Sequence, residues 1–338
     1  MKVLVITRSE ENDSVTLVTE ELLTRGAQVV RFDTDRYPQD VKVKSIYGSG
    51  LTQQIVALGT NSGYIELQEF DSVWYRRFSA GNALPASLGD TFDACRDEAR
   101  LTLYGTIVSL DCFHLDPVTK VRGTDYKELQ VREAVRLGLT VPPTLFTIDP
   151  NAVLQFAAKV RGDLITKVQG HFAIYRDGLE NVVYTNRLKP GDLTKLGGLR
   201  YSPMIFQQAV SKKLELRATV VGRQVFCGAI DSQQSERAET DWRRDGNRLL
   251  EHWHPHELPK EVAEKLLRLA DFFGLNYAAA DFILCPDGEY HFLEINAAGE
   301  WLWLQQICGL PISQAIAEVL TEPTARRLDR VTPDCSKK

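Results

Sequence analysis

Closely spaced cysteines are missing from this sequence. Its six cysteines are scattered over 338 residues, and none of them form a Cys-x-x-Cys pair. Zinc sites and disulfide frameworks depend on closely or regularly spaced cysteines. We therefore predict neither, and we expect the thiols to be buried as small apolar side chains.

Long hydrophobic runs and an excess of basic residues are missing as well. No segment approaches the ~20 apolar residues that span a bilayer, and the apolar opening turns polar at Thr7, too soon for a secretory signal. The chain has 40 basic and 45 acidic residues and a net charge of −5, unlike the basic surfaces that bind nucleic acid. We expect a cytoplasmic protein that binds neither membrane nor nucleic acid.

The composition is that of a folded protein, at a length suited to more than one domain. Hydrophobic residues make up 43% and charged residues 25% of the chain, close to the average for globular domains. The length of 338 residues exceeds the ~100–200 residues of a typical domain. We therefore expect two or three modules that share one compact body.

The N-terminal part begins with a strand-helix-strand pattern. Val3–Ile6 and Gln28–Phe32 are apolar strands, and apolar residues recur at helical spacing between them. This pattern predicts a parallel sheet with a right-handed crossover. The unit resembles a Rossmann-like one, but its first loop, Thr7–Glu11, lacks the Gly-x-Gly-x-x-Gly fingerprint. We expect no nucleotide at that loop.

The remaining chain alternates helices, strands and hairpins, which predicts a mixed α/β protein. A helix is predicted from its N-cap Thr124 to Gly138, after a linker at His114–Pro117. Further expected elements are strands at 41–44, 64–70, 72–77, 164–168 and 204–208, helices at 90–110, 151–160, 259–273 and 312–320, a hairpin turn at Asp177-Gly178, and hairpins that pair 214–221 with 224–230 and 277–284 with 290–296.

Three oxygen-bearing side chains stand in the last predicted hairpin. Asp281 lies on its first strand, and Glu294 and Asn296, two residues apart, share one face of the second. A polar group within an apolar strand is costly unless it is paired or bound to a metal. Oxygen ligands without His or Cys suit Mg²⁺ at ATP phosphates. An ordinary salt-bridged face is the alternative.

Two lysines occur in apolar settings upstream of this hairpin. Lys167 lies inside the strand 164–168, and Lys127 lies in the first turn of the helix that begins near Thr124. Either lysine would supply positive charge to a triphosphate. A solvated surface lysine is the alternative for each.

The order of these features resembles that of the ATP-grasp superfamily. A lysine at a helix start, a lysine on a strand, a connector, a carboxylate strand and a final hairpin with Asp and Glu-x-Asn follow one another. The resemblance implies an α/β (α+β) fold in which two halves hold ATP, behind a pre-ATP-grasp Rossmann-like domain. The implied boundaries are 1–115 for the N-terminal domain, 116–205 for the central subdomain, 206–325 for the C-terminal subdomain and 326–338 for a tail.

The same resemblance implies contacts to the adenosine. The hinge Met204–Ala209 would meet adenine, through Gln207, Gln208 and Ala209, and Glu215 would bind ribose. An ion pair between Glu215 and Arg217 on one strand face is the alternative.

Three arginines are implied to act on the transferring phosphoryl group. Arg217 would reach phosphate, and Asp241-Trp242-Arg243-Arg244 resembles the segment of RimK-like ligases whose arginines stabilise phosphoryl charge. A solvated basic loop is the alternative for Arg243 and Arg244. The segment 168–172 departs from the pattern of the superfamily. Many ATP-grasp proteins have a glycine-rich phosphate lid at this place, whereas this segment has a single glycine, Gly170.

A narrower resemblance is to the microviridin-type peptide cyclases, nearest to their ester-forming branch. It is carried by Arg31–Pro38, Ser72–Arg77, Asp241–Arg244 and Phe292–Asn296. It implies that ATP and Mg²⁺ activate Asp or Glu side chains of a ribosomally made precursor peptide as acyl phosphates, which Thr or Ser hydroxyls then displace. It also implies a homodimer.

Two surfaces are candidates for binding the peptide. Arg76 and Arg77 end the strand Ser72–Tyr75 and should point to opposite faces, so that one of them binds a substrate carboxylate; a solvated strand end is the alternative. The charged region Tyr175–Leu199 is a candidate docking edge for the leader segment.

Other activities stay open at this point. They are a RimK-like ligase that adds amino acids to a carboxylate, an amide-forming cyclase, a regulatory module that holds ATP without turnover, and a phosphotransferase. A degenerate module should lose its metal ligands first, so the intact Lys127, Lys167, Asp281, Glu294 and Asn296 argue against the regulatory module.

Overall fold

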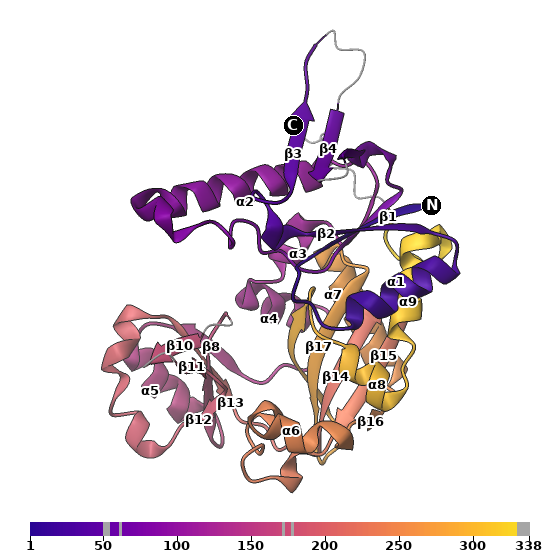
Figure 1. The fold of residues 1–338 in the computed structure, drawn as a ribbon. Helices are drawn as coiled ribbons and strands as arrows, with labels where there is room; N and C mark the ends of the chain where they lie inside the picture. The colour runs from indigo at the N-terminus through magenta and orange to yellow at the C-terminus, as the bar shows by residue number, and fades with distance from the viewer. Residues whose placement is uncertain (50–54, 61–62, 171–172, 177–178, 330–338) are drawn as a thin grey trace.

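The computed structural model describes residues 1–49, 55–60, 63–170, 173–176 and 179–329, and its N-terminal part is built on a parallel sheet with the order β2-β1-β6-β7 (Figure 1). Alternate residues of β1 pack toward α1 and toward α2, as expected for an apolar strand covered on both faces. The predicted parallel opening is confirmed. The helices and strands of this part are β1 (Lys2–Thr7), α1 (Ser14–Thr24), β2 (Gln28–Asp33), β3 (Lys42–Ile46), β4 (Ile55–Thr60), β5 (Gly63–Glu66), β6 (Ser72–Tyr75), α2 (Phe92–Val108) and β7 (Phe113–Leu115).

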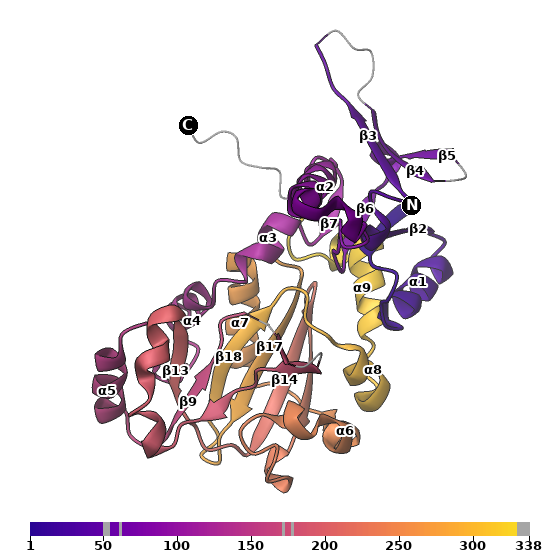
Figure 2. The ribbon, with the colours of Figure 1, turned by 60° about the vertical axis from the view of Figure 1, so that its left-hand side comes forward.

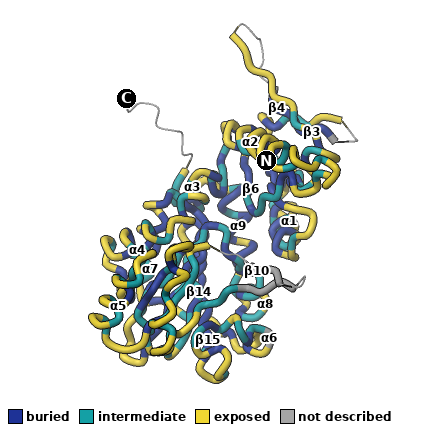
Figure 3. Tube along the Cα trace, turned by 90° about the vertical axis from the view of Figure 1, so that its left-hand side faces the viewer, coloured by how far each residue is buried: buried dark blue, intermediate teal, exposed yellow. Residues whose placement is uncertain are grey.

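A small antiparallel sheet, β3-β4-β5, projects from this part away from the rest of the molecule (Figure 2). Strand β3 is exposed along most of its length (Figure 3). Val56 and Leu58 of β4 are buried in the same cluster as Leu4 and Ile6 of β1. The strands predicted at 41–44 and within 64–70 correspond to β3 and β5, whereas β4 was not predicted.

The central part carries an antiparallel sheet with the order β12-β9-β13-β8. Phe206 of β13 packs on Val153 of α5 and on Leu199, which joins the sheet to its covering helix. The predicted turn Asp177-Gly178 lies outside the described residues, and the strands on either side of it are antiparallel. The elements of this part are α3 (Val118–Gly123), α4 (Lys127–Arg136), β8 (Thr144–Thr147), α5 (Pro150–Lys159), β9 (Leu164–Lys167), β10 (Ala173–Arg176), β11 (Leu179–Val182), β12 (Asn186–Arg187) and β13 (Met204–Gln208).

The C-terminal part carries a second antiparallel sheet, with the order β16-β15-β14-β17-β18. Helix α7 covers one face of it with Leu266, Leu269, Ala270 and Phe273, which form one stripe at helical spacing. Gly274 caps the C-terminus of this helix, with a φ of 73° that favours glycine. The elements are β14 (Leu214–Val221), β15 (Gln224–Ile230), α6 (Gly246–Leu249), β16 (His254–Pro255), α7 (Lys260–Phe273), β17 (Tyr277–Leu284), β18 (Tyr290–Asn296), α8 (Leu302–Cys308) and α9 (Ile312–Thr321).

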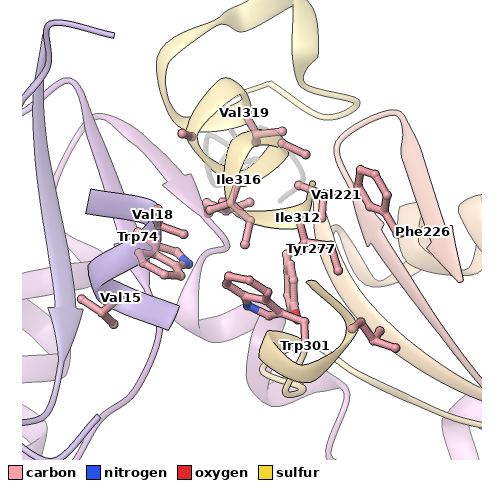
Figure 4. Close-up of a cluster of buried hydrophobic side chains, with 14 of the residues drawn as sticks. Val15, Val18, Trp74, Val221, Phe226, Tyr277, Trp301, Ile312, Ile316 and Val319 are labelled. Atoms are coloured by element: carbon pink, nitrogen blue, oxygen red, sulfur yellow. The ribbon is translucent and has the colours of Figure 1, made fainter. Parts of the chain in front are cut away.

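Helix α9 returns to the N-terminal sheet and joins it to the C-terminal sheet. Ile312, Ile316 and Val319 lie between Trp74 of β6 on one side and Val221 of β14 on the other (Figure 4). All of these side chains are buried. The two parts therefore share one apolar core, which fixes the N-terminal sheet beside β14 and β17.

The start of the central part differs from the sequence-based expectation. Thr124 is not the N-cap of the predicted helix, because it ends α3, and α4 begins at Lys127 after Tyr126. The end of that helix is as predicted, since Gly138 follows α4 with a φ of 82°. The predicted N-cap lies two residues before the actual one, Tyr126, and α3 was not predicted; the Thr124 hydroxyl instead donates to Val121 O of α3 at 2.7 Å.

The predicted linker at His114–Pro117 is not a free connection. His114 and Leu115 belong to β7, and the buried Asp116 carboxylate accepts the backbone N–H groups of Asn276 and Tyr277, each at 2.8 Å. This carboxylate ties the N-terminal sheet to the start of β17.

The first residues of the predicted tail are held against the body. Arg326 donates to Val319 O at 3.0 Å, and Arg327 contacts an Asp271 oxygen at 2.6 Å. Residues 330–338 lie outside the described residues. Within the described part of the chain, no helix combines the length and the apolar character needed to cross a bilayer.

Candidate active site

A cavity of about 370 Å³ lies between the central sheet and the C-terminal sheet. Strands β9 and β13 contribute residues to one wall, and β14, β17 and β18 contribute residues to the other. The structure brings most of the predicted site residues together here: Lys127, Lys167, Gln207, Gln208, Ala209, Glu215, Arg217, Arg243, Asp281, Glu294 and Asn296. Arg244, Arg76 and Arg77 do not line this cavity.

The two carboxylates of the C-terminal sheet lie side by side. Asp281 of β17 is the register partner of Glu294 of β18, and a bulge follows Asp281. Asp281 Oδ1 lies 3.0 Å from Arg217 Nε, and Glu294 Oε2 lies 2.9 Å from Lys127 Nζ. Asn296 Oδ1 accepts the N–H of Ala298 at 2.9 Å. Each oxygen donor of the predicted metal set therefore has a protein partner within the chain.

The surroundings push the pKa values of these two carboxylates apart. Burial raises the pKa of Asp281 to about 6, although Arg217 acts against the rise. Burial would also raise the pKa of Glu294, but Lys127 and Lys167 outweigh it and lower the pKa to about 2. Both groups are therefore mainly ionised at neutral pH.

These side chains fit a magnesium ion that is shared with a nucleotide. Two carboxylates and one amide oxygen are hard donors of the kind that Mg²⁺ prefers. The described residues contain no group of three His, Cys, Asp or Glu side chains that could hold a metal by themselves. Mg²⁺ typically takes one or two carboxylates and completes its coordination with water and phosphate oxygens, so this donor set suits it.

The two candidate phosphate lysines come from different elements. Lys127 begins α4, and Lys167 ends β9 opposite Ile205 of β13. Burial lowers the pKa of Lys167, and no carboxylate of the described chain lies within 4.0 Å of its ammonium group. Lys167 therefore lines the cavity without an ion-pair partner among the described residues.

The backbone of the predicted hinge is partly engaged within the protein. The N–H of Gln208 donates to Pro143 O at 2.9 Å, and the N–H of Ala209 donates to Asp163 O at 2.8 Å. The Gln207 side chain is buried and donates to Thr144 Oγ1 at 2.8 Å. These two backbone N–H groups are therefore not available to adenine in this conformation.

Glu215 has a partner that sequence reasoning missed. Lys212 Nζ contacts Glu215 Oε1 at 2.9 Å and Thr240 O at 2.7 Å, and Lys212 also lines the cavity. The alternative pairing of Glu215 with Arg217 is not seen, because Arg217 pairs with Asp281.

The two neighbouring arginines of the 3-10 helix Trp242–Asp245 have different places. Arg243 lines the cavity, and the hydrogen bonds that it donates to Asp241 at 2.8 and 2.6 Å raise the pKa of its guanidinium. Arg244 instead donates to Thr185 O and to Asn186 Oδ1, each at 2.7 Å. In this conformation Arg244 therefore ties the 3-10 helix to β12 rather than facing the cavity.

Arg76 and Arg77 reach the same acceptors. Both contact Glu300 and donate to Ala298 O, so the expectation that they point to opposite faces is wrong. Strand β6 ends at Tyr75, and strand alternation does not extend past that end. Their predicted binding of a substrate carboxylate stays a prediction, although each already has a carboxylate partner.

Three tryptophans stand beside Arg217. Trp242, Trp253 and Trp303 have ring centroids 5.2 to 6.1 Å apart, and the guanidinium of Arg217 lies 5.4 Å from the centroid of Trp303. Trp242 and Trp253 line the cavity. The sequence offered no signal for this cluster, because its members come from three separate segments.

Comparison with known proteins places this site in a family. The model of the MvdD pre-ATP grasp domain matches residues 2–122. A RiPP-associated ATP-grasp ligase from Chryseobacterium gregarium, solved in complex with ADP and a leader and core peptide, is 40% identical over 98% of this chain and 99% of that chain, with a TM-score of 0.93. The chain belongs to the RiPP-associated ATP-grasp ligases.

Two further structures support this membership. Macrocyclase MdnC from Microcystis aeruginosa MRC, solved with its precursor peptide MdnA, is 42% identical over 95% of this chain and 99% of that chain, with a TM-score of 0.87. Macrocyclase MdnB from the same organism is 34% identical over the same shares, with a TM-score of 0.78. The comparison with curated proteins gives no match. The predicted ATP-grasp fold with a pre-ATP-grasp domain is confirmed.

Proposed function

We propose that this RiPP-associated ATP-grasp ligase uses Mg-ATP to activate Asp and Glu side chains of a ribosomal precursor peptide and joins them to Thr or Ser hydroxyls as ω-esters. The cavity carries the proposal, because lysines of the central part face paired carboxylates of the C-terminal sheet across it. The complexes of the relatives support it, since one holds ADP with leader and core peptide and another holds its precursor peptide.

The nucleotide would bind between the two sheets. Lys167 and Lys127 would supply positive charge to the phosphates, and Glu215, held by Lys212, would accept a ribose hydroxyl. The hinge residues Gln207, Gln208 and Ala209 would border the adenine.

The metal would be held by Asp281, Glu294 and Asn296, and when bound it supplies positive charge that offsets the charge of the phosphates. Glu294 and Asp281 would exchange their present partners, Lys127 and Arg217, for this role. Both cations then become free to contact phosphate or the substrate carboxylate.

The chemistry needs no protein nucleophile. A substrate carboxylate oxygen attacks the γ-phosphorus, the bond to ADP breaks, and an acyl phosphate forms. A Thr or Ser hydroxyl oxygen then attacks the carbonyl carbon, phosphate leaves with the bridging oxygen, and the hydroxyl proton passes to phosphate or solvent. Arg217 and Arg243 would stabilise the charge on the transferring group, and the position of the acyl phosphate between the two sheets would limit its contact with water.

The ester product rests on the resemblance of the sequence to the ester-forming branch. The docking of the leader at 175–199, a homodimer and a cytoplasmic location stay predictions, and part of the docking edge lies outside the described residues.

The test is incubation of the protein with Mg-ATP and a precursor peptide rich in Thr, Asp and Glu, with the mass of the peptide followed. The proposal predicts the loss of one water per crosslink, matched by one ADP and one phosphate. Crosslinks that resist mild alkaline hydrolysis would indicate amides instead of esters. ADP release with free amino acids added to the peptide, and no loss of water mass within it, would favour the RimK-like alternative.

A further inference from the structure

The two arginines at the end of β6 hold the loop that follows Asn296. Arg77 Nη1 donates to Ala298 O at 2.7 Å, and Arg76 Nη1 donates to the same oxygen at 3.4 Å. The N–H of Ala298 donates in turn to Asn296 Oδ1 at 2.9 Å. One residue, Ala298, therefore connects guanidinium groups of the N-terminal domain to an amide oxygen in the cavity.

Two carboxylates contact the guanidinium groups of this arginine pair. Glu300 contacts both guanidinium groups and accepts a hydrogen bond from Asn12 at 3.1 Å. The Glu11 side chain is only 2% exposed and lies 3.7 Å from Arg76 and 3.6 Å from Arg77. Arg8 lies 3.6 Å from Glu11 as well, so three guanidinium groups surround two carboxylates in a partly buried cluster. The planar fork of arginine suits such a site, because it can donate to a carboxylate and a carbonyl at once.

The other side of the same loop rests on the cavity wall. Tyr277 donates its hydroxyl to Gly299 O at 2.7 Å. A Cβ atom on Gly299 would lie 2.4 Å from Ala279 Cβ and 3.3 Å from Arg217 Nη1. The loop is therefore held between the arginine pair and the strands β14 and β17, with no room for a side chain.

We propose that Arg77, supported by Arg76, is a positioning residue that sets the place of the Asn296 oxygen through Ala298. The N-terminal domain would thereby act on the metal site without contributing a ligand to it. This role differs from the binding of a substrate carboxylate and uses the contacts that the two arginines make. The inference rests on the proposed function, because it takes Asn296 as a ligand of Mg²⁺.

The test compares Arg77→Lys with the wild-type protein. Lysine keeps the positive charge opposite Glu11, so the net charge of the cluster is unchanged, but a single ammonium group cannot span Ala298 and Glu300 as the arginine fork does. The affinity for a non-hydrolysable ATP analogue is measured by calorimetry with saturating Mg²⁺ and again with a chelator. The affinity with Mg²⁺ divided by the affinity in chelator measures how much the metal contributes to binding of the analogue. This measurement does not depend on turnover.

We expect Arg77→Lys to lower this ratio by ~10-fold or more, as for other residues that orient a metal ligand, and to leave the affinity in chelator unchanged. An unchanged ratio would overturn the inference. This holds even if both affinities fall, because an equal loss with and without Mg²⁺ indicates a general disturbance of the cavity.

Arg25→Ala is the matched control, and Asn296→Ala separates the two proposals. Arg25 also joins the N-terminal and C-terminal parts, but it does so through Glu318 at 2.8 Å and Glu322 at 2.5 Å and not through the loop at Ala298. Its loss should therefore not change the ratio. Asn296→Ala should lower the ratio strongly. If it does not, the metal assignment itself is wrong; if it does while Arg77→Lys behaves as wild type, only the positioning role is wrong.

Discussion

Lys127 Nζ lies 2.9 Å from Glu294 Oε2, so that the first residue of α4 and a residue of β18 form an ion pair across the cavity. The two lysines near Glu294 lower its pKa to about 2 against the effect of burial. Glu294 therefore stays ionised throughout the neutral pH range. A permanently charged carboxylate next to the predicted phosphate lysines is suited to exchange a lysine for a metal ion.

Replacement of Glu294 by Gln should abolish ATP turnover, with a loss of more than about 100-fold, because a direct ligand should matter more than the residues that orient it. The substitution keeps the shape of the side chain, so the protein should stay folded, but it removes the ion pair with Lys127 and should lower the melting temperature. ADP release and thermal unfolding are the measurements. Glu289→Gln, at an exposed turn of the same hairpin, should leave turnover unchanged. Retained turnover in Glu294→Gln would contradict the metal assignment.

A methyl group on Gly299 should disturb both stability and activity. Gly299→Ala would place a Cβ atom 2.4 Å from Ala279 Cβ and 3.3 Å from Arg217 Nη1. Overpacking of this kind costs about 1–3 kcal/mol, which chemical denaturation can measure. Gly197→Ala is the control, because a Cβ atom there meets nothing within 4 Å. Equal stability of the two variants would show that the loop has more room than its contacts indicate.

Glu215→Gln should raise the KM for ATP by about 10-fold with a smaller effect on kcat, because it weakens a charged hydrogen bond to the ribose, and such bonds contribute ~1.5–3 kcal/mol. Steady-state kinetics with varied ATP concentration provides the measurement. Glu236→Gln, at an exposed position, is the control. A fall in kcat at unchanged KM would speak against a role in ribose binding.

The stability of the protein should depend on the ionisation of Asp116. Burial raises the pKa of Asp116 to about 7 in the folded state, against ~3.9 in an unfolded chain. The folded state therefore binds this proton more tightly than the unfolded chain does. The resulting contribution to the free energy of unfolding is complete below about pH 4 and is lost as the pH rises through about 7. The loss amounts to up to about 4 kcal/mol.

The comparison with Asp116→Asn isolates this effect from the titration of other groups. The free energy of unfolding of the wild type, relative to that of the variant, should fall between about pH 4 and pH 7. Chemical denaturation of both proteins at a series of pH values measures it. A difference that does not change with pH would show that Asp116 is ionised in the folded state throughout.

The site residues whose relative positions were predicted correctly from the sequence are those positioned by local structure. Strand alternation places Glu294 and Asn296 on one face, and the short turn after Leu284 brings Asp281 opposite Glu294. These relationships lie within one continuous hairpin, from Tyr277 to Asn296, so the local sequence pattern is enough to predict them.

The parts that sequence reasoning missed depend on distant partners. Arg76 meets Glu300, 224 residues later in the chain, and no local pattern indicates that the pair would turn toward each other. Arg244 and Arg243 are neighbours with the same chemistry, yet the acceptors on β12 and at Asp241 draw them to different places. The linker at His114–Pro117 looked polar and irregular because its buried carboxylate pairs with the backbone of β17, which the sequence of the segment does not show.

The transfer of heavy oxygen from the peptide to phosphate tests the central claim most directly. A precursor peptide whose Asp and Glu carboxylates carry heavy oxygen is incubated with the protein and Mg-ATP, and the released phosphate is examined by mass spectrometry. An acyl phosphate intermediate predicts one heavy oxygen in each phosphate per water lost from the peptide, because the carboxylate oxygen leaves with the phosphoryl group. Unlabelled phosphate, with crosslinks formed, would contradict activation of the carboxylate.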